Sequence, residues 1–182
     1  MATIRTISGP VNIGASNTIG LAYVILPHEH LVCNFHDVEN TGKFSYNKDN
    51  VILGLVKEIN LFKDRGGFLI VDPTVRGIGR DIEIIRRVSQ ETGVHFVSAT
   101  GFYRNEFIPT YAQKSSIEEL VDIMLKDIIE GIDNTDIKAG IIKVASSRYE
   151  ITSLEHRTLT AAGKVHLKTG LPIITHADIG QQ

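Results

Sequence analysis

The sequence predicts an α/β fold built on a parallel β-sheet, and two observations support this prediction. Apolar runs rich in strand-forming residues, each too short for a helix, recur at residues 21–26, 68–71, 94–99, 139–144 and 171–176. Near-continuous apolar strands of this kind are buried on both faces, as in parallel sheets. An amphipathic helical pattern separates each run from the next, and this alternation is typical of α/β proteins.

The first elements follow from their start and stop signals. Turn signals at residues 8–10 and 14–17 predict a small β-hairpin within residues 1–20, ahead of the first core strand. A helix is predicted over residues 50–65, before a pair of glycines. A second helix is predicted over residues 81–92, and Gly93 ends it.

The two later helices carry capping signals. Ser116 and Glu119 predict a capping box at the start of the third helix. Thr152 or Ser153 caps the fourth helix, and Gly170 follows its end. Five strands in this order fit either a doubly wound sheet or a (β/α)8 barrel. A whole barrel usually needs ~250 residues, so the chain is too short for one.

Composition limits the class of protein. The chain has 182 residues and a mass of 20.1 kDa, which predicts a single domain over residues 1–182. Its 19 basic and 21 acidic side chains give a net charge of −2, which predicts neither a nucleic-acid nor a membrane partner. The one cysteine, Cys33, excludes an intrachain disulfide framework and is expected to be a small buried apolar side chain. A reducing compartment, and therefore a cytoplasmic location, is expected.

Two histidines form the sharpest local motif. His28 and His30 follow the first apolar run, and residues i and i+2 of a strand point to the same side. Both imidazoles could then face one metal ion, while Glu29 faces away. The alternative is a pair of polar side chains at a strand end. His176, at the end of the last apolar run, could equally be a ligand or a hydrogen-bonded side chain.

Lys143 is unusual because it lies inside an apolar strand pattern. A buried ammonium is costly, so such a lysine tends to be paired or to lose its proton. A neutral amine can react with CO2, and the resulting carbamate can bridge two metal ions. The alternative is a lysine that extends along the strand to reach water. Asp72, at another strand end, is expected to have a structural role. Residues 77–81 are expected to turn the chain and cap the next helix rather than bind phosphate.

These residues and their surroundings resemble the phosphotriesterase family of the amidohydrolase superfamily. The matching stretches occur in the family's order at residues 27–31, 71–81, 100–103, 138–145 and 172–176. Residues 72–81 and 101–103 most resemble the phosphotriesterase-like lactonases. The resemblance implies a partial (β/α)8 TIM barrel comprising about its first five strands, with an N-terminal β-hairpin.

The resemblance also implies a binuclear centre of divalent ions, with zinc expected. By resemblance, His28 and His30 bind the more buried ion, His176 binds the more exposed ion, and carbamylated Lys143 (N6-carboxylysine) bridges both. Tyr103 matches a tyrosine that contacts the substrate. The implied reaction is hydrolysis of a lactone, ester or phosphotriester by a metal-bridging hydroxide, and the implied assembly is a homodimer.

The sequence departs from the family pattern after His176. The family also uses a histidine of strand 6 and an aspartate of strand 8, which these 182 residues do not supply. We therefore assign no catalytic residue and expect an N-terminal fragment with impaired activity. A TatD-like metal-dependent nuclease is an alternative, although Lys143 and the net charge disfavour it. A further alternative is a non-catalytic relative that acts as a binding or assembly partner.

Overall fold

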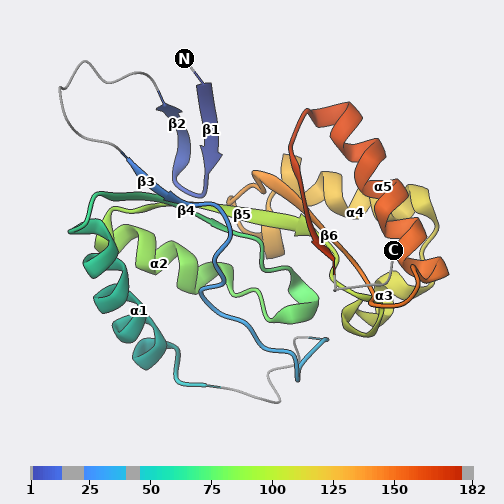
Figure 1. Cartoon of the computed structure of the whole chain (residues 1–182), viewed down its shortest axis with the longest axis horizontal. Helices are drawn as coiled ribbons and strands as arrows, with labels where there is room; N and C mark the ends of the chain where they lie inside the picture. Colours follow the sequence, from blue (N-terminus) through green and yellow to red (C-terminus); the bar gives the residue numbers. More distant parts are fainter. Residues whose placement is uncertain (1, 14–22, 40–45, 178–182) are drawn as a thin grey trace.

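A curled sheet of five parallel strands organises the chain (Figure 1). The computed structural model describes residues 2–13, 23–39 and 46–177. The hydrogen-bonded order of the strands is their order in the sequence, and they comprise β3 (Val24–Leu26), β4 (Gly67–Asp72), β5 (His95–Gly101), β6 (Ile141–Ser146) and β7 (Ile173–Ala177). A doubly wound sheet would reverse this order at a switch point. The sheet is therefore part of a barrel, as the resemblance implied.

Four long helices alternate with these strands. They are α1 (Lys48–Lys63), α2 (Ile82–Thr92), α4 (Ile117–Ile129) and α5 (Ser153–Thr169). Shorter pieces are α3 (Thr110–Gln113) and the 3-10 turns η1 (Arg76–Ile78), η2 (Asn105–Phe107) and η3 (Ile132–Asn134). The first helix begins two residues earlier than predicted because Asn47 caps it by accepting from the backbone N–H of Asn50.

The predicted helix ends are confirmed. Ser116 and Glu119 form the capping box of α4, and Thr152 rather than Ser153 caps α5. Gly93 and Gly170 end their helices in the left-handed conformation that glycine adopts without strain. The four-residue α3 escaped prediction because a single turn carries no periodic pattern.

The N-terminal hairpin lies at the amino end of the sheet. It consists of β1 (Ala2–Thr6) and β2 (Gly9–Ile13), which pair antiparallel. The backbone N–H of Ile7 donates to the carbonyl of Phe96 in β5 over 2.8 Å. The Arg5 guanidinium donates to the carbonyl of Ile128 in α4 over 3.1 Å. The predicted turn at residues 14–17 lies outside the described residues.

Alternation along the strands builds two cores. Ile70, Phe96 and Ile142 belong to the large core between the sheet and the helices. Their neighbours Leu69 and Val97 belong to a second cluster, which contains no residue of the four long helices. This second cluster lines the concave inner face of the sheet. An open hollow of about 1180 Å³ lies beside it, between the inner face and the hairpin.

The two edge strands are open along one side. Among the described residues, β3 pairs only with β4, and β7 pairs only with β6. Apolar side chains on these edges remain accessible, with 41% of Val24 and 37% of Ile173 exposed. Unpaired edge strands are sites where further strands can add.

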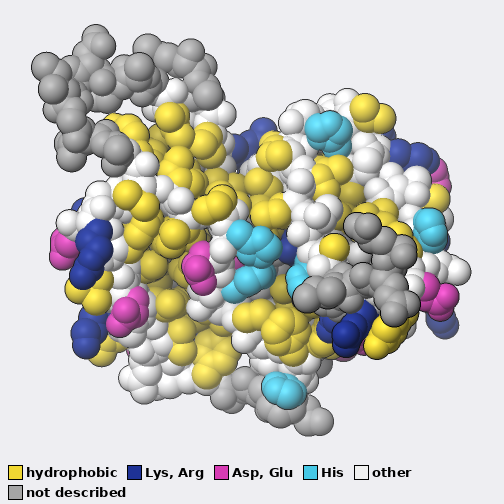
Figure 2. All heavy atoms as spheres, viewed as in Figure 1, with side chains coloured by type: hydrophobic (Ala, Val, Ile, Leu, Met, Phe, Trp, Pro, Cys, Tyr) yellow, Lys and Arg dark blue, Asp and Glu magenta, His cyan; other side chains and the backbone are white. Residues whose placement is uncertain are grey.

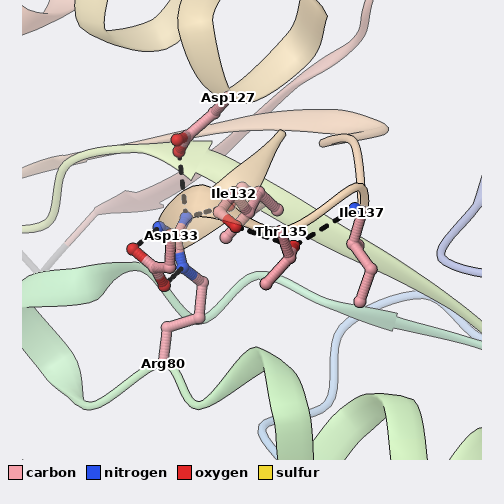
Figure 3. A network of polar contacts seen from close by, with 7 residues as sticks. Arg80, Asp127, Ile132, Asp133, Thr135 and Ile137 are labelled. Carbon is pink, nitrogen blue, oxygen red and sulfur yellow. Dashed lines mark hydrogen bonds and ion pairs between the residues drawn. The ribbon is translucent and has the colours of Figure 1, made fainter. Parts of the chain in front are cut away.

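A buried arginine joins the loops on the helical side of the sheet (Figure 3). Only 4% of Arg80 is exposed, and its guanidinium donates to the carbonyl of Ala99 in β5 over 2.8 Å. The same group pairs with Asp127 of α4 and with Asp133 of η3, each over 3.1 Å. Asp133 has a φ of +49°, which a non-glycine residue rarely adopts. The predicted roles of residues 77–81 are confirmed, since η1 turns the chain and Asp81 caps α2.

One minor prediction was wrong. Cys33 is exposed rather than buried, because it lies in the irregular segment after β3 instead of in the strand itself. In the described part of the chain, every helix is too short or too polar to cross a membrane.

Candidate metal centre

The two histidines of the motif lie together just beyond β3. The strand ends at Leu26 and the chain bends at Pro27 and His28. The N–H of Glu29 still donates to the carbonyl of Val71 in β4 over 3.0 Å. The two imidazoles lie together as predicted, although this segment bends rather than continuing the strand. Their Nε2 atoms are 3.3 Å apart. Two ring nitrogens therefore face each other where they could share a ligand.

The His30 ring is held by neighbouring residues. Its Nδ1 lies 2.7 Å from the hydroxyl of Thr74, and that hydroxyl donates to the carboxyl of Asp72. Asp72 is the last residue of β4 and is 1% exposed. Its predicted structural role is to hold Thr74 and, through it, the His30 ring. The backbone N–H of Leu31 also donates to Asp72, over 3.4 Å.

Lys143 lies in the middle of β6, and its side chain is fully buried. Its Nζ finds no hydrogen-bond acceptor among the described residues. Burial lowers the pKa of this amine, because desolvation penalises the charged form. The Lys143 side chain therefore lies inside the protein and does not extend along the strand to reach water.

A close backbone approach sets the position of Lys143. Gly101 ends β5 with a φ of +110°, and a side chain there would overlap the carbonyl oxygen of Lys143. The next N–H, that of Phe102, donates to this same carbonyl over 2.9 Å. Only glycine permits this contact without moving one of the two strands.

His176 and Tyr103 complete the rim. His176 in β7 lies in register with Ala145 in β6, two residues beyond Lys143. The Tyr103 ring centroid is 5.0 Å from that of His176 and 6.0 Å from the Lys143 amine. Phe35 and Phe107 contact the other side of the tyrosine ring, with centroids 5.9 and 5.6 Å away. Tyr103 and Phe107 are close in the chain, but Phe35 and His176 are far from them, so no local pattern predicted the whole cluster.

The electrostatics show that the four predicted ligand side chains share one region. Burial, and then the charges of Lys143 and His176, lower the pKa of His28. Burial followed by the charges of His28, Lys143 and His176 lowers the pKa of His30 to about 4. These effects favour neutral imidazoles, which are the form that binds metal ions. Figure 2 shows histidine side chains gathered near the middle of one face, beside hydrophobic ones.

The charges of Lys143 and His176 act on His28 and His30, which lie beyond the carboxyl end of β3. Lys143 lies inside β6, His176 lies near the carboxyl end of β7, and the Tyr103 ring is close to both. Their roles as ligands and as a substrate contact stay predictions. Within the residues that the structure describes, no three His, Cys, Asp or Glu side chains form a ready-made metal site.

Curated relatives match between 66% and 90% of this chain. An aryldialkylphosphatase from Saccharolobus solfataricus is 36% identical over 90% of this chain and 51% of its own length. A phosphotriesterase homology protein from Escherichia coli is 35% identical over 83% of this chain and 51% of its own length. A human N-acetyltaurine hydrolase is 35% identical over 66% of this chain and 34% of its own length.

Solved structures agree with this relationship. A triple mutant of organophosphorus hydrolase from Deinococcus radiodurans superposes with a TM-score of 0.84 at 33% identity. It is covered to 55% by this chain, which is itself covered completely. A second structure, described as organophosphate hydrolysis activity engineered from a weak promiscuous lactonase template, gives a TM-score of 0.84 at 32% identity.

The fold and these structures define a segment of a (β/α)8 barrel. The model of the phosphotriesterase family matches residues 3–182, and the chain belongs to that family. It spans about half the length of the first curated relatives it matches.

Proposed function

We propose that the chain supplies the metal-binding half of a hydrolase that acts on a lactone, an ester or a phosphotriester. The observation that carries this proposal is the Lys143 amine, which is buried and without a hydrogen-bond acceptor among the described residues, beside three histidines. A buried amine with no partner is costly, and its conversion to a metal-binding group would remove that cost.

The donor set fits a pair of divalent ions. His28, His30 and His176 would offer imidazole nitrogens, which suit zinc. The neutral Lys143 amine would attack CO2 to form a carbamate and release one proton, so that an uncharged nitrogen becomes an anionic oxygen donor. The lowered pKa of Lys143 favours this reaction, because only the unprotonated amine has a free electron pair. When bound, the ions would lower the pKa of a water molecule and polarise the bond to be broken.

The side chains around the centre would bind the substrate. Tyr103 is 8% exposed and lies between Lys143 and His176, so its ring would form a wall for the leaving side of the substrate. The guanidinium of Arg104 lies 5.5 Å from the centre of this ring and would hold it in place. Phe35, which is 44% exposed, would extend the apolar wall towards the surface.

The remaining expectations belong to the same proposal. Residues 1–182 would form one domain, no catalytic acid or base is assigned among them, and the activity of the chain by itself would be impaired. A cytoplasmic location, expected from the single cysteine, and a homodimer, expected from the resemblance, complete it.

Metal stoichiometry tests the proposal. The purified chain, dialysed against zinc and bicarbonate, is expected to hold two ions per chain by elemental analysis. Lys143→Ala is expected to lose that binding, and ¹³C-bicarbonate should give a carbamate signal in the wild type only. Lys138→Ala, an exposed lysine just before β6, is the matched control and should keep both ions. A wild-type chain without bound metal would favour the non-catalytic alternative, and full binding by Lys143→Ala would refute the role of that lysine.

A further inference from the structure

We propose that Asp72 and Thr74 are positioning residues that fix the tautomer of His30, with the proton on Nδ1 and a free electron pair on Nε2. The inference rests on the proposed function for its purpose, because a metal ion would need that electron pair. Its geometry stands on three hydrogen bonds, two of them within residues 72–74 and the third between Thr74 and His30.

The first step is the orientation of the Thr74 hydroxyl. Asp72 and Thr74 flank Pro73, and the chain turns so that the backbone N–H of Thr74 donates to Oδ1 of Asp72 over 2.8 Å. The hydroxyl of Thr74 donates to the same oxygen. Both side chains are 1% exposed, so water does not compete for these bonds. Burial raises the pKa of Asp72, but the backbone N–H groups of Thr74 and Leu31 both donate to its carboxylate and favour the ionised, accepting form. The single proton of the Thr74 hydroxyl is therefore committed to the carboxylate.

The second step is the proton on His30. Nδ1 of His30 lies 2.7 Å from the Thr74 hydroxyl oxygen, which is a hydrogen-bond distance. Because that hydroxyl has already given its proton to Asp72, its oxygen can only accept. Nδ1 must then be the donor. A neutral imidazole carries one N–H, so Nε2 is left with its electron pair.

The threonine is needed because the carboxyl does not reach the ring. Nδ1 of His30 and Oδ1 of Asp72 are 3.9 Å apart, too far for a direct hydrogen bond. Thr74 bridges this gap, and the order from carboxyl to hydroxyl to imidazole defines a relay. The unprotonated Nε2 of His30 then faces Nε2 of His28 at 3.3 Å, and His28 supplies the proton between them in the metal-free chain.

The groups that hydrogen-bond to the second ring nitrogen of a metal-binding histidine usually fix its tautomer, and losing one typically costs 10–100-fold in metal affinity. The sequence gives a clean pair of variants. Thr74→Val keeps the shape of the side chain and removes the hydroxyl, whereas Thr74→Ser keeps the hydroxyl. The relay predicts that Thr74→Val loses the His30 tautomer and zinc affinity and that Thr74→Ser keeps both. A purely structural role for a buried side chain would not predict this difference.

The test reads the tautomer directly. Long-range ¹H–¹⁵N spectra of the metal-free chain are expected to show His30 protonated at Nδ1 in the wild type and in Thr74→Ser. Thr74→Val should gain a population protonated at Nε2, the form that free imidazoles prefer. Zinc affinity, measured by competition with a coloured chelator, should fall by about 10–100-fold in Thr74→Val and recover in Thr74→Ser.

The two proposals fail separately. A wild-type His30 protonated at Nε2 overturns the relay, and this measurement needs no variant that might misfold. Unchanged tautomer and affinity in Thr74→Val overturn it as well. If His30 shows the expected tautomer but the wild type binds no zinc, the relay stands and the proposed hydrolase function fails.

Discussion

At the scale of single residues, the site is built from side chains whose surroundings oppose a positive charge. His30 shows this best, because burial and three basic neighbours lower its pKa to about 4. An unfolded chain has no such surroundings, and its imidazole has a pKa near 6.5. Between these two values, the unfolded chain binds more protons than the folded one.

This difference predicts the pH dependence of the metal-free chain. The contribution of His30 to the free energy of unfolding should be fully present above about pH 6.5. It should be lost as the pH drops towards 4, because protons then bind more tightly to the unfolded state. Urea melts between pH 7 and pH 4.5, with His30 ring shifts followed by NMR, measure both effects. His30→Asn should weaken the dependence, and His156→Asn, an exposed residue of α5, should not. A His30 that titrates near 6.5 would contradict the prediction.

The residue scale also shows what could be predicted from sequence. The spacing of His28 and His30, and a lysine within an apolar strand, were readable because a short pattern carries them. Thr74 and His30 are 44 positions apart, so their hydrogen bond had no local signal. The left-handed backbone of Gly101 was equally hidden, because glycine occurs in many conformations.

At the scale of elements, Arg80 joins β5, α4 and η3 in one buried ion-pair network. The helices themselves were predictable from their caps and apolar spacing. Their attachment was not, since Arg80 and Asp127 are 47 residues apart. The network also holds Asp133 in its left-handed conformation, which would otherwise be unfavourable by roughly 1–3 kcal/mol.

Removing the arginine should therefore be costly. Arg80→Met would leave the partly exposed carboxylates of Asp127 and Asp133 without their cation and the Ala99 carbonyl without this donor. We expect a loss of ~1–3 kcal/mol in the free energy of unfolding. Arg86→Met is the matched control, because its partner Asp136 is 86% exposed. That variant should lose ~0–1 kcal/mol. Urea denaturation of both variants measures the difference. Equal losses in the free energy of unfolding would refute the proposed contribution of the Arg80 network to stability.

At the scale of the whole molecule, the sheet is a partial barrel with two open edges and an open inner face. Both architectures that the sequence allowed use the same alternation of strands and helices. The order of strands separates them, and that order follows from long-range pairing that no local pattern encodes. The comparisons give the same answer, since the superposed hydrolase is covered to 55%.

The open inner face predicts weak catalysis. With zinc, the purified 182-residue chain is expected to hydrolyse lactones at a rate near background, because the substrate would meet solvent where a closed barrel would enclose it. Lactone turnover by the monomer, compared with zinc alone and with Lys143→Ala, is the measurement. Robust turnover that disappears in Lys143→Ala would overturn this prediction.

The contact between Gly101 and the backbone of Lys143 has a consequence for how this site can evolve. The depth of the lysine is set by main-chain atoms of two adjoining strands, which no rotamer change can adjust. Side chains on the rim can therefore vary, whereas a single added methyl group at position 101 would displace Lys143 itself. Tolerance to mutation should thus rise steeply with distance from the contact between Gly101 and Lys143.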